Sequence, residues 1–335
     1  MKPLPPVEQV TGGVWSIPVV VPDNPIGWTQ AYVLESSAGP YLVDTGWNAP
    51  EAWDGLLAGL VEAGTTVGEI QGVLITHHHP DHLGLAGRVR EASGCWVGMH
   101  AADTALVERH RELLLDDPEV MHAETERLLQ EADATRCEID EIVGAARALP
   151  LPLPALPDRG VGSEVLRLGD RTVRAIHTPG HTPGHLCLYL EDVDLLLTGD
   201  HLLSTISSHV GVYGFEDLAA DPLRDYLDSL RLLQDHEPAE ILPAHRGRFH
   251  GVRDRVEVLV AHHEERLAEL KDALADGPLT PWQLCHRMTW NRPWDEIPVL
   301  MRRAALAEVF AHVRRLEHEG LVTVERGTPT LVRPT

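Results

Sequence analysis

Four histidines and one aspartate lie within six residues in the segment His77–His82, which reads His-His-His-Pro-Asp-His. The segment directly follows the apolar run Gly72–Thr76, which predicts a buried strand. Side chains alternate along an extended chain, so His77 and His79 should point to one side and His78 to the other. The proline turns the chain and directs the aspartate and the last histidine toward a second position. Imidazole nitrogens and carboxylate oxygens bind zinc, iron or manganese, so the segment indicates a site for two metal ions.

Three further motifs, each just beyond an apolar strand-like run, supply the rest of a ligand set. They are Thr178–His185, which repeats Thr-Pro-Gly-His, the Thr-Gly-Asp of Thr198–Asp200, and the Pro-Ala-His of Pro243–His245. A single His-x-His pair is weak evidence, because such pairs occur by chance and bind metal poorly. The combination of these motifs at the ends of successive strands favours one shared metal site.

Taken in order, these motifs resemble those of the metallo-β-lactamase superfamily over roughly the first 250 residues. The resemblance implies an α/β fold, the αββα sandwich, with the site along one edge of the sheets. It also implies two divalent metal ions, with zinc as the default and iron or manganese equally suited to the ligands. The implied ligands are His77, His79 and His181 for one ion, Asp81, His82 and His245 for the other, and Asp200 as the bridge between them.

Two further residues are candidates for orienting the ligands. Asp44, in the segment Tyr41–Gly46, matches the first motif of the superfamily and is expected to accept a hydrogen bond from a ligand histidine. The alternative is an aspartate that caps the turn after a strand. His185 follows His181 by four residues, and it either orients the site or is simply buried and hydrogen-bonded.

Two divalent cations lower the pKa of a shared water, so a bridging hydroxide would be available near neutral pH. Asp81 and Asp200 are the candidate catalytic residues, and Asp81 or a water would pass a proton to the leaving group. Arg246 and Arg248 follow the ligand His245 closely and are candidate contacts for a substrate anion such as a carboxylate or phosphate.

The Thr178–His185 motif resembles glyoxalase II and favours a hydrolase of carboxylic thioesters or esters, lactones included, whose small-molecule substrate carries an apolar acyl portion. His201 stands where lactonases of the superfamily carry a tyrosine, and Tyr213 is a distant substitute. A phosphodiesterase or endoribonuclease with the same two-metal site is the main alternative. A module that binds a metal or ligand without catalysis is a third.

The charge of the chain argues against nucleic acid as a partner without excluding it. The formal net charge is -23 at pH 7, and such a surface repels a phosphate backbone unless basic residues gather somewhere. Residues 279–335 are the exception, with eight Arg and six Asp or Glu. Arginines at 302, 303, 314 and 315 are candidate phosphate contacts, but glutamates on the same predicted helix favour a solvated face or a homodimer interface.

Cysteine usage and the N-terminus predict a cytoplasmic protein. The four cysteines, Cys95, Cys137, Cys187 and Cys285, are scattered without Cys-x-x-Cys spacing, which argues against a disulfide framework. The segment Met1–Glu8 lacks the apolar stretch of a signal peptide, and no apolar run is long enough to span a membrane.

The pattern along the chain predicts a catalytic domain at residues 1–276 and a winged-helix-like domain at 279–335. A helical insertion over about 102–158 interrupts the first and ends in the proline-rich segment Leu149–Pro157, which is either an apolar lid or a rigid connector. In the second, a capping box at Thr280 starts a helix, a longer helix covers about 300–319, and a hairpin follows. One branch of the superfamily, which includes β-lactamase-like protein 2, carries such a domain behind its hydrolase domain.

Overall fold

The computed structural model describes residues 3–117, 119–149, 152–212 and 220–335. Tyr213 and the Pro150-Leu151 part of the proline-rich segment lie outside these residues. Contacts divide the chain into two compact units. The first comprises Met1–Arg111, Pro152–Ser208 and Ser229–Arg255, and the second comprises Glu112–Leu151, His209–Asp228 and Val256–Thr335.

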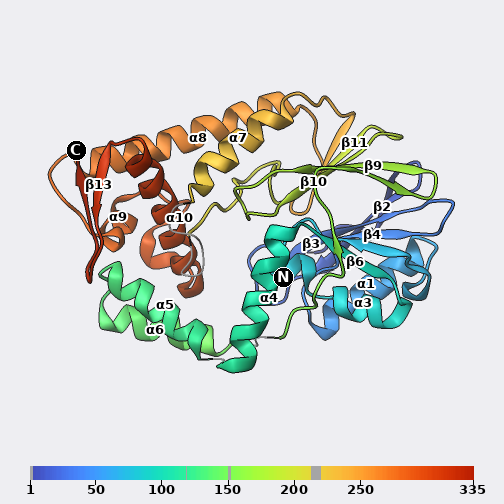
Figure 1. Ribbon diagram of the computed structural model, residues 1–335, viewed down its shortest axis with the longest axis horizontal. Helices are drawn as coiled ribbons and strands as arrows, with labels where there is room; N and C mark the ends of the chain where they lie inside the picture. The colour runs from blue at the N-terminus through green and yellow to red at the C-terminus, as the bar shows by residue number, and fades with distance from the viewer. Residues whose placement is uncertain (1–2, 118, 150–151, 213–219) are drawn as a thin grey trace. The chain divides into compact units, whose positions relative to one another are not determined.

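In the first unit the described residues form two mixed β-sheets that stack face to face (Figure 1). The first sheet follows the order of the chain from β1 to β7, antiparallel up to β4 and parallel from β4 onward. Its strands are β1 (Glu8–Thr11), β2 (Val14–Val20), β3 (Trp28–Leu34), β4 (Tyr41–Val43), β5 (Gly72–Leu74), β6 (Trp96–Met99) and β7 (Arg159–Gly160).

The second sheet has the strand order β12-β11-β10-β9-β8. All neighbours are antiparallel except β11 and β12, which run parallel. Its strands are β8 (Val165–Leu168), β9 (Arg171–His177), β10 (Leu186–Leu190), β11 (Leu195–Gly199) and β12 (Glu240–Pro243).

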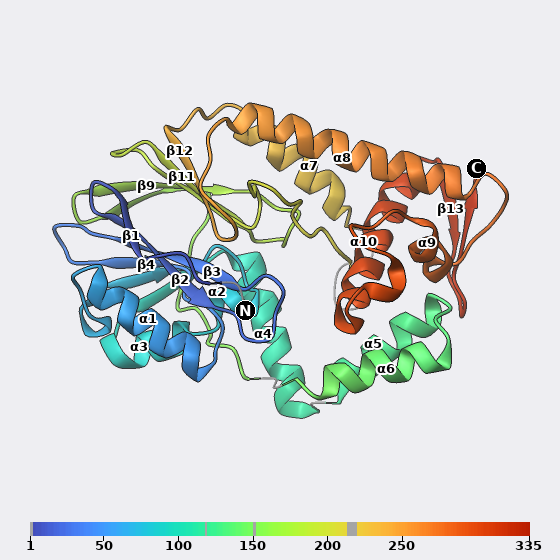
Figure 2. The same cartoon turned by 180° about the vertical axis from the view of Figure 1, so that it is seen from behind.

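Strand β3 shows how alternation builds the layers of this unit. Ala31 and Val33 pack toward α1 (Pro50–Glu62) and α3 (Ala86–Ser93), the helices that cover the outer face of the first sheet in Figure 2. Tyr32 and Leu34, on the other face of the same strand, pack into the core between the two sheets. The predicted α/β fold with stacked sheets and flanking helices is therefore confirmed.

Short helical segments lie in the loops that join the strands of the first unit. The 3₁₀ turn η1 (Val67–Glu69) precedes β5, and the single-turn helix α2 (Pro80–Leu83) follows it, with Pro80 at its first position. The described part of the proline-rich segment is held at its carbonyl oxygens, since Arg111 Nη1 donates to Pro154 O and Arg90 Nη1 donates to Leu156 O at 2.8 Å. These contacts are those expected of a rigid connector, and the role of a lid stays a prediction.

The second unit is helical and contains a hairpin. Among the described residues, the ranges of the two units divide three helices, which are α4 (Ala101–Asp116), α7 (Pro222–Leu233) and α8 (Val252–Ala273). The remaining elements of the second unit are α5 (Val120–Glu131), α6 (Arg136–Arg147), α9 (Pro281–Arg287), η2 (Trp294–Glu296), α10 (Val299–His318), β13 (Val322–Glu325) and β14 (Leu331–Pro334).

The insertion helices α5 and α6 share one core with the C-terminal helices. Leu129 and Ile142 from the insertion lie in the same buried cluster as Leu270, Leu284 and Leu306 from α8, α9 and α10. Short amphipathic helices cannot bury their apolar faces alone, and here each finds its partner across a long sequence separation. The C-terminal helices therefore share their core with the insertion, and the division into domains at 1–276 and 279–335 stays a prediction.

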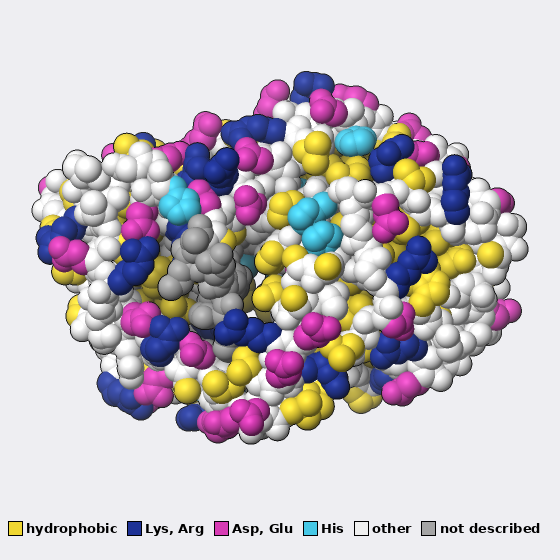
Figure 3. All heavy atoms as spheres, in the orientation of Figure 1, with side chains coloured by type: hydrophobic (Ala, Val, Ile, Leu, Met, Phe, Trp, Pro, Cys, Tyr) yellow, Lys and Arg dark blue, Asp and Glu magenta, His cyan; other side chains and the backbone are white. Residues whose placement is uncertain are grey.

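Charged side chains of both signs are interspersed on one face of the molecule. On the face seen in Figure 3, lysines and arginines lie singly or in small groups among aspartates and glutamates. Two C-terminal arginines form ion pairs within the protein: Arg302 Nη1 lies 3.3 Å from Glu141 Oε2, and Arg315 Nη1 lies 3.2 Å from Asp221 Oδ2. Within the described part of the chain, no helix combines the length and hydropathy needed to cross a bilayer.

Candidate metal centre

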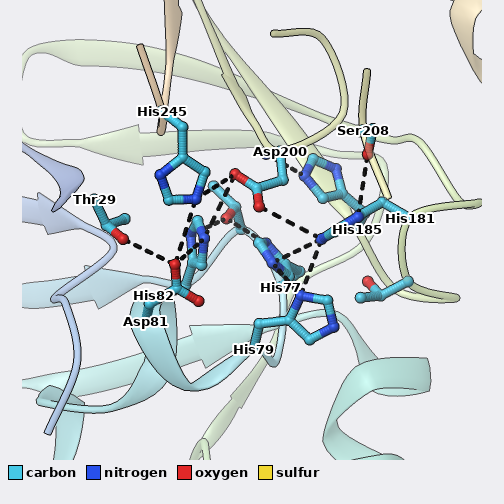
Figure 4. A network of polar contacts seen from close by, with 12 residues as sticks. Thr29, His77, His79, Asp81, His82, His181, His185, Asp200, Ser208 and His245 are labelled. Carbon is cyan, nitrogen blue, oxygen red and sulfur yellow. Dashed lines mark hydrogen bonds and ion pairs between the residues drawn. The ribbon is translucent and has the colours of Figure 1, made fainter. Parts of the chain in front are cut away.

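All seven predicted ligands converge where the strands of the sandwich end (Figure 4). β4, β5 and β6 are parallel, as are β11 and β12, so the loops that leave their carboxyl ends meet at one edge. Segment 77–82 follows β5, the loop 178–185 joins β9 to β10, and the last two ligands follow β11 and β12. These predicted ligands, all of them in groups that could hold a metal ion, are His77, His79, Asp81, His82, His181, Asp200 and His245.

Three ring nitrogens form a tight triangle in the first group. His181 Nε2 lies 3.1 Å from His77 Nε2 and 3.0 Å from His79 Nδ1, and the latter two atoms are 3.1 Å apart. Ligand nitrogens in a tetrahedral zinc site lie about 3.3 Å apart, since each is about 2.0–2.1 Å from the metal. Burial lowers the pKa of His77 and of His79 well below the usual value, so both rings are neutral and offer lone pairs.

The second group joins two histidines and a carboxylate. His245 Nε2 lies 3.3 Å from Asp81 Oδ2, and His82 Nε2 lies 3.6 Å from the same oxygen. The buried Nε2 atoms of both rings, like Asp200 Oδ1, make no hydrogen bond of good geometry within the described residues. Buried polar atoms without such partners are costly, so their convergence fits a second metal ion.

Asp200 reaches both groups with its two oxygens. Oδ2 lies 3.6 Å from His181 Nε2, whereas Oδ1 lies 3.2 Å from His245 Nε2 and 3.6 Å from His82 Nε2. Burial disfavours the charged ring of His245, but Asp200 outweighs it and raises the pKa to about 10. Burial likewise opposes ionisation of Asp200, while His245 and His82 hold its pKa well below the usual value. The ionised carboxylate can thus span two cations.

Asp44 supports the ligands from behind, as the sequence predicts. Its Oδ2 lies 2.8 Å from His82 Nδ1, and its Oδ1 accepts from Thr76 N at 2.8 Å. The Thr76 hydroxyl donates to Asp44 Oδ2 at 2.8 Å and lies 3.0 Å from His77 Nδ1. Asp44 and Thr76 together direct the Nε2 atoms of two ligand rings inward. Sequence reasoning missed Thr76, although it directly precedes the histidine motif.

His185 contacts the bridging residue through the backbone. Its Nε2 accepts from Asp200 N at 3.2 Å, and its Nδ1 lies 2.9 Å from Thr178 Oγ1. Since Nε2 accepts, the proton lies on Nδ1 and Thr178 accepts it. His185 lies outside the three potential metal-binding groups and holds the loop that carries Asp200.

Three contacts that fix ligand side chains were not predicted. Ser208 Oγ lies 3.1 Å from His181 Nδ1. Thr29 Oγ1 donates to Asp81 Oδ2 at 2.9 Å, and the carbonyl oxygen of Trp28 lies 3.0 Å from His245 Nδ1. No motif marks these residues, because each meets its ligand only through the packing of distant segments.

The two predicted anion contacts differ in their surroundings. Arg248 donates to Glu240 Oε2 at 2.7 Å and to Glu8 Oε1 at 3.2 Å, so its charge is already matched. Arg246 adopts a left-handed backbone with φ 72, and its buried Nε has no hydrogen-bond partner among the described residues. A contact of either arginine with a substrate anion stays a prediction.

Residues 28–245 match the family model described as Metallo-beta-lactamase superfamily. The chain belongs to this superfamily. The resemblance expected from the motifs is thereby confirmed, and the matched range includes all seven residues of the metal centre.

Relatives match this superfamily member over most of its length. Probable metallo-hydrolase YqjP of Bacillus subtilis is 25% identical over 313 residues, which is 89% of this chain and 90% of YqjP. The Beta-lactamase-like protein 2 homolog of Caenorhabditis elegans is 24% identical over 322 residues, which is 95% of this chain and 88% of that homolog. A solved structure, a metallo-beta-lactamase family protein from Thermus thermophilus, matches with TM-score 0.80 and 32% identity, covering 96% of this chain and 99% of that one.

A more distant relative has a named substrate class. The Atrochrysone carboxyl ACP thioesterase of Aspergillus fumigatus is 25% identical over 245 residues, 72% of this chain. The match covers 44% of that protein. The superfamily member described here is thus a metallo-hydrolase by family and by its buried His/Asp cluster, with a thioesterase among its distant relatives.

Proposed function

We propose that this protein is a metal-dependent hydrolase that cleaves a carboxylic thioester or ester, lactones included, at a dinuclear site. The position of Asp200 supports this most strongly, since its two oxygens face two separate groups of ligand nitrogens. The distant thioesterase relative supports the substrate class. The metals are most simply zinc, because imidazole and carboxylate ligands suit it, and iron or manganese would suit the same ligands.

When bound, two divalent cations would lower the pKa of a water and polarise the carbonyl oxygen of the substrate. The triangle of His77, His79 and His181 would hold one cation, and Asp81, His82 and His245 the other, with Asp200 between them. Asp44 and Ser208 keep ligand rings turned inward.

Asp81 is the residue we assign to proton transfer. Burial opposes its ionisation, but His82 and His245 hold its pKa below the usual value, so it is present as a carboxylate. Thr29 fixes one of its oxygens by a hydrogen bond of 2.9 Å. A thiolate leaving group needs little protonation, whereas an alkoxide needs more, so this step matters most for oxygen esters.

A covalent mechanism through cysteine does not fit the site. Cys187 is the cysteine closest in sequence to the ligand His181, and it is completely buried. Burial raises the pKa of its thiol to about 12, which leaves almost no thiolate near neutral pH. Direct attack by water is therefore the mechanism we propose.

The C-terminal elements support a winged-helix-like arrangement as part of this proposal. The helix α9 begins with the predicted capping box, in which Gln283 N donates to Thr280 Oγ1 at 3.3 Å. α10 and the antiparallel hairpin β13–β14 follow it. Leu279 forms a bridge to Val332, which adds a third short segment beside the hairpin.

Initial rates on an acyl-CoA thioester and on a short RNA, each with and without a chelator, test the proposed function. We expect thioester hydrolysis that the chelator abolishes and that added divalent metal restores, without cleavage of RNA. The His79→Ala protein, purified in the same way, controls for contaminating esterases. Cleavage of RNA without thioester hydrolysis would overturn the proposal in favour of a nuclease.

A further inference from the structure

Asp103 is a buried carboxylate outside the metal-binding groups. It lies in the first turn of α4 and is completely inaccessible to solvent. Its Oδ2 accepts from His78 N at 2.9 Å and lies 3.1 Å from His78 Nδ1. The hydroxyl of Thr182 donates to the same oxygen at 2.8 Å, and Gly184 N donates to Oδ1 at 2.6 Å.

These contacts connect the two loops that carry the first metal-binding group. His78 stands between His77 and His79, and Thr182 directly follows His181. One carboxylate therefore sets the distance between the loop after β5 and the loop that joins β9 to β10. It also holds the ring of His78 by a contact of 3.1 Å, apart from the triangle of His77, His79 and His181.

The close approach of α4 to the second loop requires glycine at position 184. A Cβ atom on Gly184 would lie 2.6 Å from Asp103 N and 2.7 Å from Asp103 Oδ1. Real Cβ atoms do not approach other atoms so closely, so any larger residue would push the loop or α4 away. The contact between α4 and the loop of His181 therefore depends on two residues, Asp103 on the helix and Gly184 on the loop.

We infer that Asp103 is a positioning residue for the first metal ion, which it serves by fixing both loops that carry the ligands His77, His79 and His181. The inference rests on the proposed two-metal function. All four groups that face the carboxylate donate to it: two backbone N–H groups, the Thr182 hydroxyl and His78 Nδ1–H. Only an acceptor-only group satisfies all of them, and the amide of asparagine would place N–H against at least one donor.

The Asp103→Asn protein tests this inference through metal binding. We expect one of the two metal ions to bind about 10- to 100-fold more weakly in competition with a chromophoric chelator, because residues behind ligands typically contribute that much. The other ion should bind as in the wild-type protein. In the cobalt-loaded protein, the altered absorption bands should be those altered in His181→Ala.

Asp221→Asn is the matched control, because Asp221 is also a buried aspartate and pairs with Arg315 in the second unit. It should lower the melting temperature without changing metal affinity, which separates positioning from general stability. Unchanged affinity for both ions and an unchanged cobalt spectrum in Asp103→Asn would overturn the inference.

Metal binding by the wild-type protein distinguishes failure of the proposed function from failure of the role assigned to Asp103. If the wild-type protein binds no pair of metals, the proposed function fails. If it binds two and Asp103→Asn binds both equally well, only the role of Asp103 fails. Should Asp103→Asn not fold, Thr182→Val removes a single hydrogen bond to the same carboxylate. A selective weakening of one ion would then support the inference, and unchanged binding would overturn it.

Discussion

Oδ2 of Asp44 lies 2.8 Å from Nδ1 of His82. Asp44 Oδ2 accepts the proton on Nδ1 of the ring, and Nε2 of the same ring lies 3.6 Å from both Asp81 Oδ2 and Asp200 Oδ1. The backbone of Asp44 is left-handed, with φ 58, a conformation that few residues other than glycine, asparagine and aspartate adopt. The turn after β4 is therefore shaped to present this carboxylate to the ligand ring.

Replacing Asp44 by asparagine should weaken metal binding without unfolding the protein. Asparagine tolerates the left-handed backbone, but it loses the negative charge behind His82. We expect about 10- to 100-fold weaker binding of one ion, measured by competition titration with a chelator. Asp23→Asn is the control, since Asp23 is exposed and also left-handed, with φ 53. Equal metal affinities for the two variants would show that Asp44 only shapes the turn.

Buried His312 should lower the stability of the second unit as the pH falls, whereas buried Glu308, whose pKa burial raises to about 7, acts in the opposite direction. His263 Nδ1 lies 3.1 Å from His312 Nε2, and His312 Nδ1 donates to Glu308 O at 2.8 Å. Burial lowers the pKa of His312 to about 4. In the unfolded chain its pKa is about 6.5, so stability is full above that pH and falls as the pH drops from 6.5 to 4. Between pH 7 and 5 the loss is about 2 kcal/mol from this residue.

His312→Gln should remove that part of the acid sensitivity. Glutamine carries no titratable group, so we expect the free energy of unfolding to fall less between pH 7 and pH 5 than in the wild-type protein. Denaturant unfolding at the two pH values measures the difference. His286→Gln, at an exposed position of the same unit, should leave the wild-type pH dependence intact. An identical slope for all three proteins would rule out a buried neutral His312.

Because the insertion and the C-terminal helices share one core, a truncation in α6 should lower the stability of the unit that contains α10. Ile142 on α6 is completely buried in that core. Ile142→Ala should lower the free energy of unfolding by about 2–5 kcal/mol, as truncations of buried residues do. Metal content of the folded protein should not change. Val258→Ala, where the side chain is 56% exposed, should cost about 0.5 kcal/mol or less. Similar stability for both variants would mean that α6 does not belong to this core.

Local patterns were enough to predict most of the secondary structure. The strand predicted at Gly72–Thr76 is β5, the helix predicted over about 300–319 is α10, and the hairpin predicted after it is β13–β14. These segments have continuous, alternating or helical spacing of apolar residues, and turn residues bound them. The joint core of α5, α6 and α10 was not predictable in this way, because an amphipathic face does not specify which distant segment will cover it.

The ligands and the contact of Asp44 with His82 were predictable, whereas the contacts of Thr29 and Asp103 were not. Histidine and aspartate motifs after strands pointed to all seven residues that the structure brings together. Thr29 and Asp103 carry no such signal, since one threonine in a strand and one aspartate in a helix are ordinary residues until the fold supplies Asp81 and His78 as partners. Polar residues that support a site are found by their contacts, and contacts between distant segments follow from packing rather than from spacing.

Metal titration of the wild-type and Asp200→Ala apoproteins, followed by thioester hydrolysis in the same samples, tests the two-metal hydrolase most directly. Asp200 is the residue whose oxygens face both groups of ligands. We predict two ions per wild-type chain and chelator-sensitive hydrolysis, against one ion or fewer and no hydrolysis for Asp200→Ala. Full activity with two ions retained in Asp200→Ala would contradict the bridging role and the mechanism built on it.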